Sequence, residues 1–241
     1  MRSNFSEYNH AISYDRIRQI LSGADTDYQE TSSLPHRDKL TFTNGFYANC
    51  SAIFVDIRGS SSLPSKYKRP RLAKLYRAYI SEVVAVMNGN VDCKEISIVG
   101  DGVWGIFDTP LMSDIDYNFS TVAKINSTIK MLNYRLSKSG YEPVEVGIGA
   151  AWGRALMVKA GLSGSGLNDV VYMGDVVNHA AKLAAAGNAS YFDEPIMISG
   201  DYYSNLKTDN KNLLTFHATR NAYHGNIINV EMDEWFAENC P

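Results

Sequence analysis

The sequence contains little cysteine and no long apolar run, and each shortage excludes a class of protein. Its 241 residues include three cysteines, Cys50, Cys93 and Cys240. Because that number is odd and no CxxC pair occurs, neither a disulfide framework nor a zinc site is expected. No apolar run approaches the roughly 20 residues that a membrane-spanning helix needs, and the first ten residues lack the apolar core of a signal peptide. We therefore expect a cytoplasmic protein without direct membrane insertion.

The sequence also lacks an excess of charge of either sign. Lys and Arg total 23, and Asp and Glu total 26, which gives a formal net charge of -3. Nucleic-acid-binding proteins usually have a basic excess, so no nucleic-acid partner is expected. A small anionic substrate remains compatible with this balance, because a local cluster of donors binds phosphate even on a slightly acidic protein.

The hydrophobic pattern divides the chain into two parts. Residues 1–48 are polar and mixed, with apolar residues between Ala11 and Leu21 that indicate one short helix. The sequence leaves open whether this segment is an arm or a linker. Signals of regular structure sharpen from residue 49, so we expect an N-terminal arm, 1–48, followed by a single domain, 49–241.

Strand and helix signals then alternate along the domain. The expected elements are a strand at 51–56, a helix over 72–87, strands at 91–98 and 103–107, a helix over 115–136 and a strand at 144–150. This β-α-β-β-α-β order is the ferredoxin-like arrangement, an antiparallel sheet with both helices on one face. Further expected elements are strands at 155–160 and 170–172, a helix at 175–186, and strands at 196–198, 213–216 and 227–230. The predicted fold class is therefore α+β, a ferredoxin-like core with an additional C-terminal helix and strands.

Two acidic residues occupy positions suited to phosphate chemistry. Asp56 ends a predicted strand and precedes a Gly/Ser turn, where backbone N–H groups could cradle a phosphate. Asp101 lies between two glycines at a predicted hairpin tip. Each has a simpler interpretation, because aspartate commonly stabilises its own turn. In this topology, however, both acids lie on one rim of adjacent strands, and two carboxylates there favour a divalent-metal site for nucleotide phosphates.

A third motif opens the predicted helix at 175–186. Asn178 and Lys182 are four residues apart, so they share one face of this helix. The alternative interpretation is a solvated polar stripe, which for Lys182 alone is the better one.

The three motifs together resemble the catalytic domain of class III nucleotidyl cyclases, over roughly residues 49–230. They are Phe-x-Asp-Ile-x-Gly from Phe54, Gly-Asp-Gly from Gly100, and Gly-Asp-x-Val-Asn-x-Ala-x-Lys-Leu from Gly174. The resemblance implies that Asp56, Asp101 and the Ile57 carbonyl hold two divalent ions, Mn²⁺ or Mg²⁺.

The same resemblance implies roles for the remaining site residues. The turn formed by Arg58, Gly59, Ser60 and Ser61 would bind the triphosphate, and Phe54 would contact the nucleotide. Asn178 would orient the ribose, and Lys182 would stabilise the transition state where the family usually has an arginine. In the family two protomers share each site, so a homodimer is expected.

The sequence departs from the purine cyclases of this family at the base-reading positions. Ser97 stands where adenylate cyclases usually have a lysine and guanylate cyclases a glutamate, and Val171 stands at the second such position. The phosphate-binding lysine expected near the C-terminus is not evident, and His224-Gly225-Asn226 occupies roughly that stretch.

Segments outside the motifs resemble the Pycsar pyrimidine cyclases of bacterial antiphage defence. These segments are 79–86, 98–110, 153–161 and 164–171. The resemblance implies UTP or CTP as the substrate and cyclic UMP or cyclic CMP as the product. That product would activate a cyclic-nucleotide-responsive effector.

Two alternatives remain open at this point. One is a purine cyclase with an unusual base pocket. The other is a catalytically degenerate module that binds nucleotide or only dimerises. The lysine at position 182 and the missing C-terminal lysine slightly favour it, whereas the presence of Asp56, Asp101 and Asn178 speaks against it. A P-loop nucleoside triphosphatase is excluded, because no GxxxxGK[ST] sequence occurs.

Overall fold

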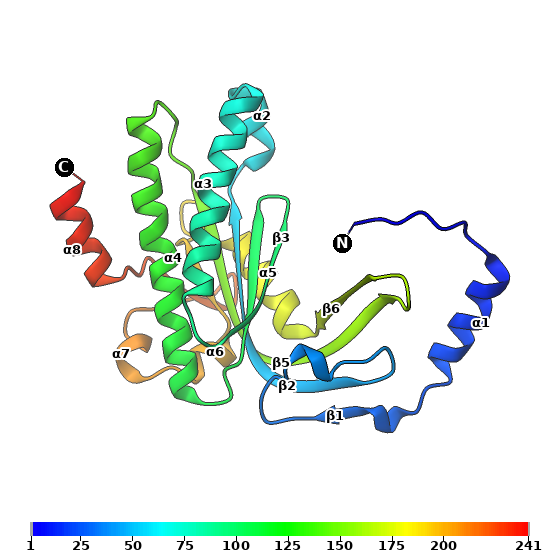
Figure 1. Cartoon of the computed structure of the whole chain (residues 1–241). Coiled ribbons are helices and arrows are strands. Elements are labelled where there is room, and N and C mark those ends of the chain that lie inside the picture. The colour runs from blue at the N-terminus through cyan, green and yellow to red at the C-terminus, as the bar shows by residue number, and fades with distance from the viewer. Residues whose placement is uncertain (1, 241) are drawn as a thin grey trace.

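One mixed sheet organises the protein, whose computed structural model describes residues 2–240. The strands follow the order β3-β4-β2-β5-β7-β9-β8, while β1 pairs with β2 and β6 pairs with β5 (Figure 1). Their bounds are β1 Tyr28–Glu30, β2 Gly45–Ile57, β3 Cys93–Val99, β4 Gly102–Phe107, β5 Val146–Leu162, β6 Leu167–Met173, β7 Ile196–Ile198, β8 Thr215–His217 and β9 Ala222–Gly225. The helices are α1 His10–Leu21, α2 Leu63–Lys66, α3 Arg69–Asn88, α4 Met112–Lys138, α5 Asp175–Ala186, α6 Gly200–Ser204, α7 Thr208–Lys211 and α8 Val230–Asn239.

Helices cover both faces of this sheet because β2 is apolar on both of its faces. Ile53 and Val55 point into a core formed with α3 and α4, which lie side by side in Figure 1. Cys50 and Ala52 point to the opposite face, into a second core formed with α5. Alternate residues of a strand face opposite sides, so one strand supplies both cores.

The predicted β-α-β-β-α-β core is confirmed, with α3 and α4 packed on the same face of the sheet. The long β5 differs from expectation, because separate strands were expected at 144–150 and 155–160. Pairing with all thirteen residues of β2 carries β5 through the intervening Ala151-Trp152-Gly153-Arg154 without a break.

The expected strand at 227–230 is wrong. The chain leaves the sheet after β9, and α8 begins at Val230. The Asn229 side chain caps this helix by accepting a hydrogen bond from the Met232 N–H at 3.0 Å. The cap and the acidic first turn of α8 were sequence signals for a helix, but the apolar Ile227-Ile228 outweighed them.

Part of the expected N-terminal arm packs against the domain. β1 pairs with the beginning of β2, and β2 itself starts at Gly45. Leu34 and Leu40 are buried in the core beneath α5, whereas α1 stands away from the sheet (Figure 1). The boundary between residues 48 and 49 stays a prediction. Among the described residues no helix is both long and apolar enough to cross a bilayer.

Glycines in β5 allow α5 to lie directly on the sheet. A Cβ atom at Gly149 would overlap the backbone carbonyl oxygen of Ala180, and one at Gly147 would overlap that of Ala184. Only glycine permits this close approach of helix and strand, and the contact fixes where α5 holds Asn178 and Lys182.

We predict that Gly149→Ala lowers the free energy of unfolding by about 3 kcal/mol, because α5 must shift away from β5. Urea denaturation of the variant measures this loss. Gly200→Ala is the matched control, since a Cβ there meets open space and stability should stay within about 0.5 kcal/mol of wild type. Equal stability of the two variants would contradict the direct helix–strand contact.

Candidate active site

The structure brings Asp56 and Asp101 together at one rim of the sheet. Asp56 is the penultimate residue of β2, and Asp101 lies in the tight turn between β3 and β4. Because Val55 pairs with Val103, the hairpin tip ends beside the end of β2. A Cβ built on Gly102 would lie 3.7 Å from the Asp56 Oδ1 atom, so this carboxylate touches the hairpin.

The pKa of Asp56 depends on its burial and on the neighbouring charges. Burial raises the pKa of Asp56, and the negative charge of Asp101 raises it further, against the opposing effect of Arg58. The Arg58 guanidinium lies 3.0 Å from Asp56 Oδ2 and also donates to the Ala185 carbonyl of α5 at 2.7 Å. Without a further cation, one arginine therefore partly balances two acids.

The acid pair fits divalent metal ions by its chemistry and by one unsatisfied atom. Carboxylate oxygens are preferred ligands of Mg²⁺ and Mn²⁺. The Asp101 Oδ2 atom is buried and has no hydrogen-bond partner among the described residues. Ile57 is the last residue of β2, so its carbonyl belongs to the same rim. Within residues 2–240 no group of three or more His, Cys, Asp and Glu side chains forms a metal cluster.

The turn after β2 depends on a glycine. Gly59 has φ 62° and ψ 24°, the left-handed conformation that favours glycine. A short 3₁₀ turn at Ser60–Ser62 follows and leads into α2. The turn, together with Lys66 of α2, borders a cavity of about 280 Å³. The Arg58 side chain points back to Asp56 rather than outward into the turn.

Asn178 and Lys182 lie on the exposed side of α5. The opposite side of the helix, with Val176, Ala180 and Leu183, is buried against the sheet. Among the described residues no side-chain hydrogen bond or ion pair engages Asn178 or Lys182, and none joins them to the acid pair. Within one chain, Asp56 and Asp101 therefore lie together at the rim of the sheet, whereas the side chains of Asn178 and Lys182 are exposed on α5.

The predicted base-reading residue Ser97 shares a face of the sheet with two aromatic side chains. Ser97 pairs with Trp104 across β3 and β4, and Trp104 pairs with Phe54 across β4 and β2. The rings of Phe54 and Trp104 stack, with centroids 5.2 Å apart and planes 3° apart. Val171 lies on β6 and is partly exposed.

Arg37 joins the strands that carry Ser97 and Val171, and the sequence interpretation missed it. Its guanidinium pairs with Glu95 of β3 at 3.2 Å and with Asp169 of β6 at 3.1 Å. Glu95 and Asp169 each lie two residues before a base-reading position, hence on the same face of the strand. No local signal marks Arg37, because its partners are 58 and 132 residues away in the chain.

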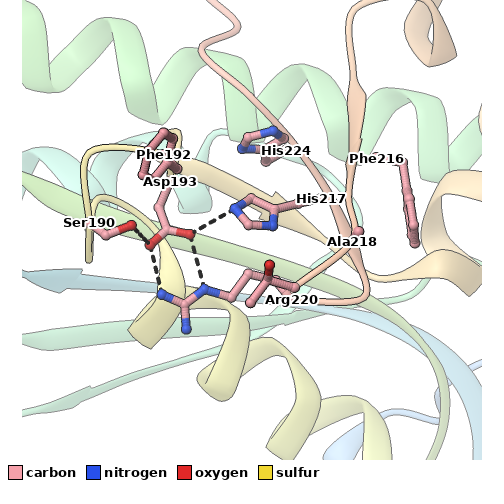
Figure 2. A pocket seen from close by; sticks show the side chains of 9 residues that line it. Ser190, Phe192, Asp193, Phe216, His217, Ala218, Arg220 and His224 are labelled. Atoms are coloured by element: carbon pink, nitrogen blue, oxygen red, sulfur yellow. Dashed lines mark hydrogen bonds and ion pairs between the residues drawn. The ribbon is translucent and has the colours of Figure 1, made fainter.

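A second polar cluster lies beyond the C-terminal end of α5 and borders a pocket of about 540 Å³ (Figure 2). Asp193 is almost fully buried and accepts hydrogen bonds from Ser190 at 2.6 Å and from two nitrogens of Arg220 at 3.0 and 2.7 Å. His217 Nε2 lies 3.2 Å from the same carboxylate. The Arg220 hydrogen bonds lower the pKa of Asp193 to about 2. The cluster ties the loop after α5 to the turn between β8 and β9.

Comparison with known proteins identifies the class to which this fold and site belong. Residues 43–226 match the model of the adenylate and guanylate cyclase catalytic domain. The chain belongs to this family, the class III nucleotidyl cyclases, and the resemblance inferred from the motifs is confirmed.

Two relatives carry a narrower name. A uridylate cyclase of Gulbenkiania mobilis is 38% identical and covers 99% of this chain and 100% of its own length. A uridylate cyclase of Treponema porcinum is 39% identical over 87% of this chain and 72% of its own length. The crystal structure of the adenylyl cyclase CyaB from P. aeruginosa shares the fold, with a TM-score of 0.60 and 22% identity over 71% of this chain and 85% of that chain.

We predict that Arg220→Ala destabilises the protein by about 3 kcal/mol at pH 7, because the buried Asp193 carboxylate loses its main partner. The native pKa of Asp193 lies below its ordinary value of 3.8, so the stabilisation is present above pH 4 and disappears as the pH falls towards 2. Urea unfolding at pH 7 and pH 3 should therefore show a smaller acid-induced loss in the variant than in wild type.

Arg18→Ala is the matched control for this test, because the Arg18–Asp15 pair is exposed on α1. Its removal should change stability by less than about 1 kcal/mol. An equal loss in both variants at pH 7 would refute the structural role of the Asp193 cluster.

Proposed function

We propose that this nucleotidyl cyclase is a pyrimidine cyclase, which converts UTP, or CTP, to the 3′,5′-cyclic monophosphate and pyrophosphate. The observation that carries the chemistry is the pairing of Asp56 with Asp101 around an unsatisfied carboxylate oxygen. The similarity to two uridylate cyclases, over 99% and 87% of this chain, supports the choice of uracil as the base.

Each group at the site has a defined part in this reaction. The ribose 3′ oxygen loses its proton and bonds to the α-phosphorus, while the bond from that phosphorus to the pyrophosphate oxygen breaks. Asp56, Asp101 and the Ile57 carbonyl hold two divalent ions, Mn²⁺ or Mg²⁺. Such ions lower the pKa of a bound hydroxyl and neutralise phosphate charge. The turn from Arg58 to Ser61 holds the triphosphate, so orientation and charge stabilisation provide most of the rate.

Asn178 acts on the sugar, and Lys182 acts on the α-phosphate. The Asn178 amide orients the ribose, and the Lys182 ammonium balances the charge that develops on the α-phosphate. Lysine is a point charge without the bidentate fork of arginine. It therefore fixes the orientation of the phosphate less tightly than an arginine at this position would.

We further propose that a homodimer completes each site. The Asn–Lys face of α5 is exposed and makes no side-chain interaction with the acids within the described chain. In a symmetric dimer each copy would contribute its acids to one site and its α5 to the other. The cyclic product would then act as a second messenger for an antiphage effector, as the resemblance to the Pycsar cyclases implies.

A catalytically degenerate nucleotide-binding module is the second candidate. Lysine replaces the usual arginine at position 182, and His224 and Asn226 occupy the stretch of the expected C-terminal lysine. Asn226 also accepts a hydrogen bond from Asn126 at 2.7 Å, which engages it within the fold. A purine cyclase remains the alternative within the cyclase class.

Incubation of the purified protein with each of the four nucleoside triphosphates and Mn²⁺ tests the proposal. We expect cyclic UMP as the main product by mass spectrometry, with cyclic CMP as the alternative pyrimidine product. EDTA, Asp56→Asn and Asp101→Asn should each abolish it, whereas the surface control Asp201→Asn should not. Cyclic AMP or cyclic GMP as the main product would favour the purine alternative, and no product from any substrate would favour the degenerate module.

Mixing two inactive variants tests the shared site. Asp101→Asn and Lys182→Ala, refolded together in equal amounts, should regain about a quarter of wild-type activity, because half of the dimers are mixed and each holds one intact site of two. Initial rates of cyclic UMP formation measure this recovery. No recovery from the mixture, with each variant still dimeric by sedimentation, would refute a site formed by two copies.

A further inference from the structure

The two strands that carry the base-reading positions do not pair with each other. Ser97 lies on β3, which pairs with β4, and Val171 lies on β6, which pairs with β5. In the sheet, β4, β2 and β5 separate these two strands. Among the described residues no backbone ladder therefore fixes the distance between β3 and β6, so a base pocket formed by both strands needs another contact to keep its width.

Arg37 makes such a contact. One nitrogen of its guanidinium lies 3.2 Å from the Glu95 carboxylate of β3, and another lies 3.1 Å from the Asp169 carboxylate of β6. A guanidinium is planar and holds its N–H donors in a fixed geometry, so one arginine sets the spacing of both acids. Each acid lies two residues before a base-reading position. A movement of either strand at its acid would therefore move that position as well.

The two acids oppose each other's charge, and Arg37 counters that effect. The Glu95 side chain is only 18% exposed. Burial raises the pKa of the Glu95 carboxyl, the positive charge of Arg37 opposes this rise, and the negative charge of Asp169 adds to it. Neighbouring carboxylates disfavour each other's charged form. Without the arginine, β3 and β6 would lose an attraction and retain a repulsion.

The backbone that carries Arg37 is anchored on both sides. Arg37 opens a short 3₁₀ turn that ends at Lys39. Leu34 and Leu40, three residues before and after Arg37, are both buried in the core beneath α5. The Leu34 N–H also donates a hydrogen bond to the Asp108 carboxylate at 2.8 Å. An arginine on an anchored turn gives up less conformational freedom when it forms its ion pairs than one on a loose terminus.

We propose that Arg37 is a positioning residue for base selection, which holds β3 and β6 at a separation that suits a pyrimidine ring. This inference rests on the proposed function, from which it takes the pyrimidine substrate, and on Ser97 and Val171 as the base-reading positions. A purine has two fused rings and needs a wider space between the strands. Arg37 acts through the two strands and not on the base itself, so its removal should weaken discrimination more than chemistry.

The test is the binding of α,β-methylene UTP, CTP and ATP to the full chain with Mn²⁺, measured by isothermal titration calorimetry. In Arg37→Gln we expect the affinity ratio of the better-bound pyrimidine analogue to the ATP analogue to fall about tenfold. The KM for the pyrimidine substrate should rise about tenfold while kcat stays within about twofold, because the proposed catalytic groups are unchanged. The melting temperature should stay close to that of wild type, since partly exposed ion pairs contribute little to stability.

Arg154→Gln is the matched control. Arg154 is 55% exposed, against 50% for Arg37, and it also pairs with an acid of the N-terminal segment, Glu30 of β1. This pair does not involve β3 or β6, so the affinity ratio should keep its wild-type value. Arg37→Lys retains the charge without the fork and should recover only part of the ratio.

An unchanged affinity ratio in Arg37→Gln would overturn the inference. An equal loss of affinity for all three analogues, with a lower melting temperature, would also overturn it, because that result indicates a structural role alone. If wild type binds the ATP analogue as tightly as the pyrimidine analogues, the proposed pyrimidine specificity is wrong and the role of Arg37 falls with it. If wild type discriminates and Arg37→Gln discriminates equally well, the proposed function stands and only the role of Arg37 is wrong.

Discussion

The antiparallel ladder between β2 and β5 is the constraint on which the rest of the molecule depends. Every residue of β2 from Gly45 to Ile57 pairs with β5. This ladder forms the shared floor of two cores, one with α3 and α4 and one with α5. It also aligns the end of β2 with the hairpin tip and places the glycines of β5 beneath α5. Both parts of the proposed site are therefore set by one strand register.

The acid pair places two carboxyl groups, one of them with a buried oxygen that lacks a hydrogen-bond partner within residues 2–240, at one rim of the sheet. Burial and the negative charge of Asp101 raise the pKa of Asp56, and Arg58 only partly opposes this rise. The Asp101 Oδ2 atom is the buried acceptor without a partner among the described residues. Carboxylates with a perturbed pKa are common at functional sites.

Local signals in the sequence predicted much of this architecture. The bounds of α5 follow from Gly174 and Gly187 on either side of an Ala- and Val-rich helix. Asp56 was recognisable because it ends a strand just before a Gly/Ser turn. Asp101 was recognisable because it lies between two glycines at a hairpin tip. The N-terminal segment was harder to interpret, since Leu34, Arg37 and Leu40 have partners that only the folded chain brings near. The same limit explains the continuous β5, which strand pairing extends through a weak local signal.

By itself the sequence determined the order of the core elements from β2 to α5 and the family, and it nominated the residues of the proposed site. These depend on composition, periodicity and short motifs, which are local properties of the chain. Only the tertiary structure decided that the hairpin tip with Asp101 lies beside Asp56 and that Arg58 joins this rim to Ala185 of α5. The physical reason is that these relations join residues far apart in the chain, and strand register and core packing set their distances.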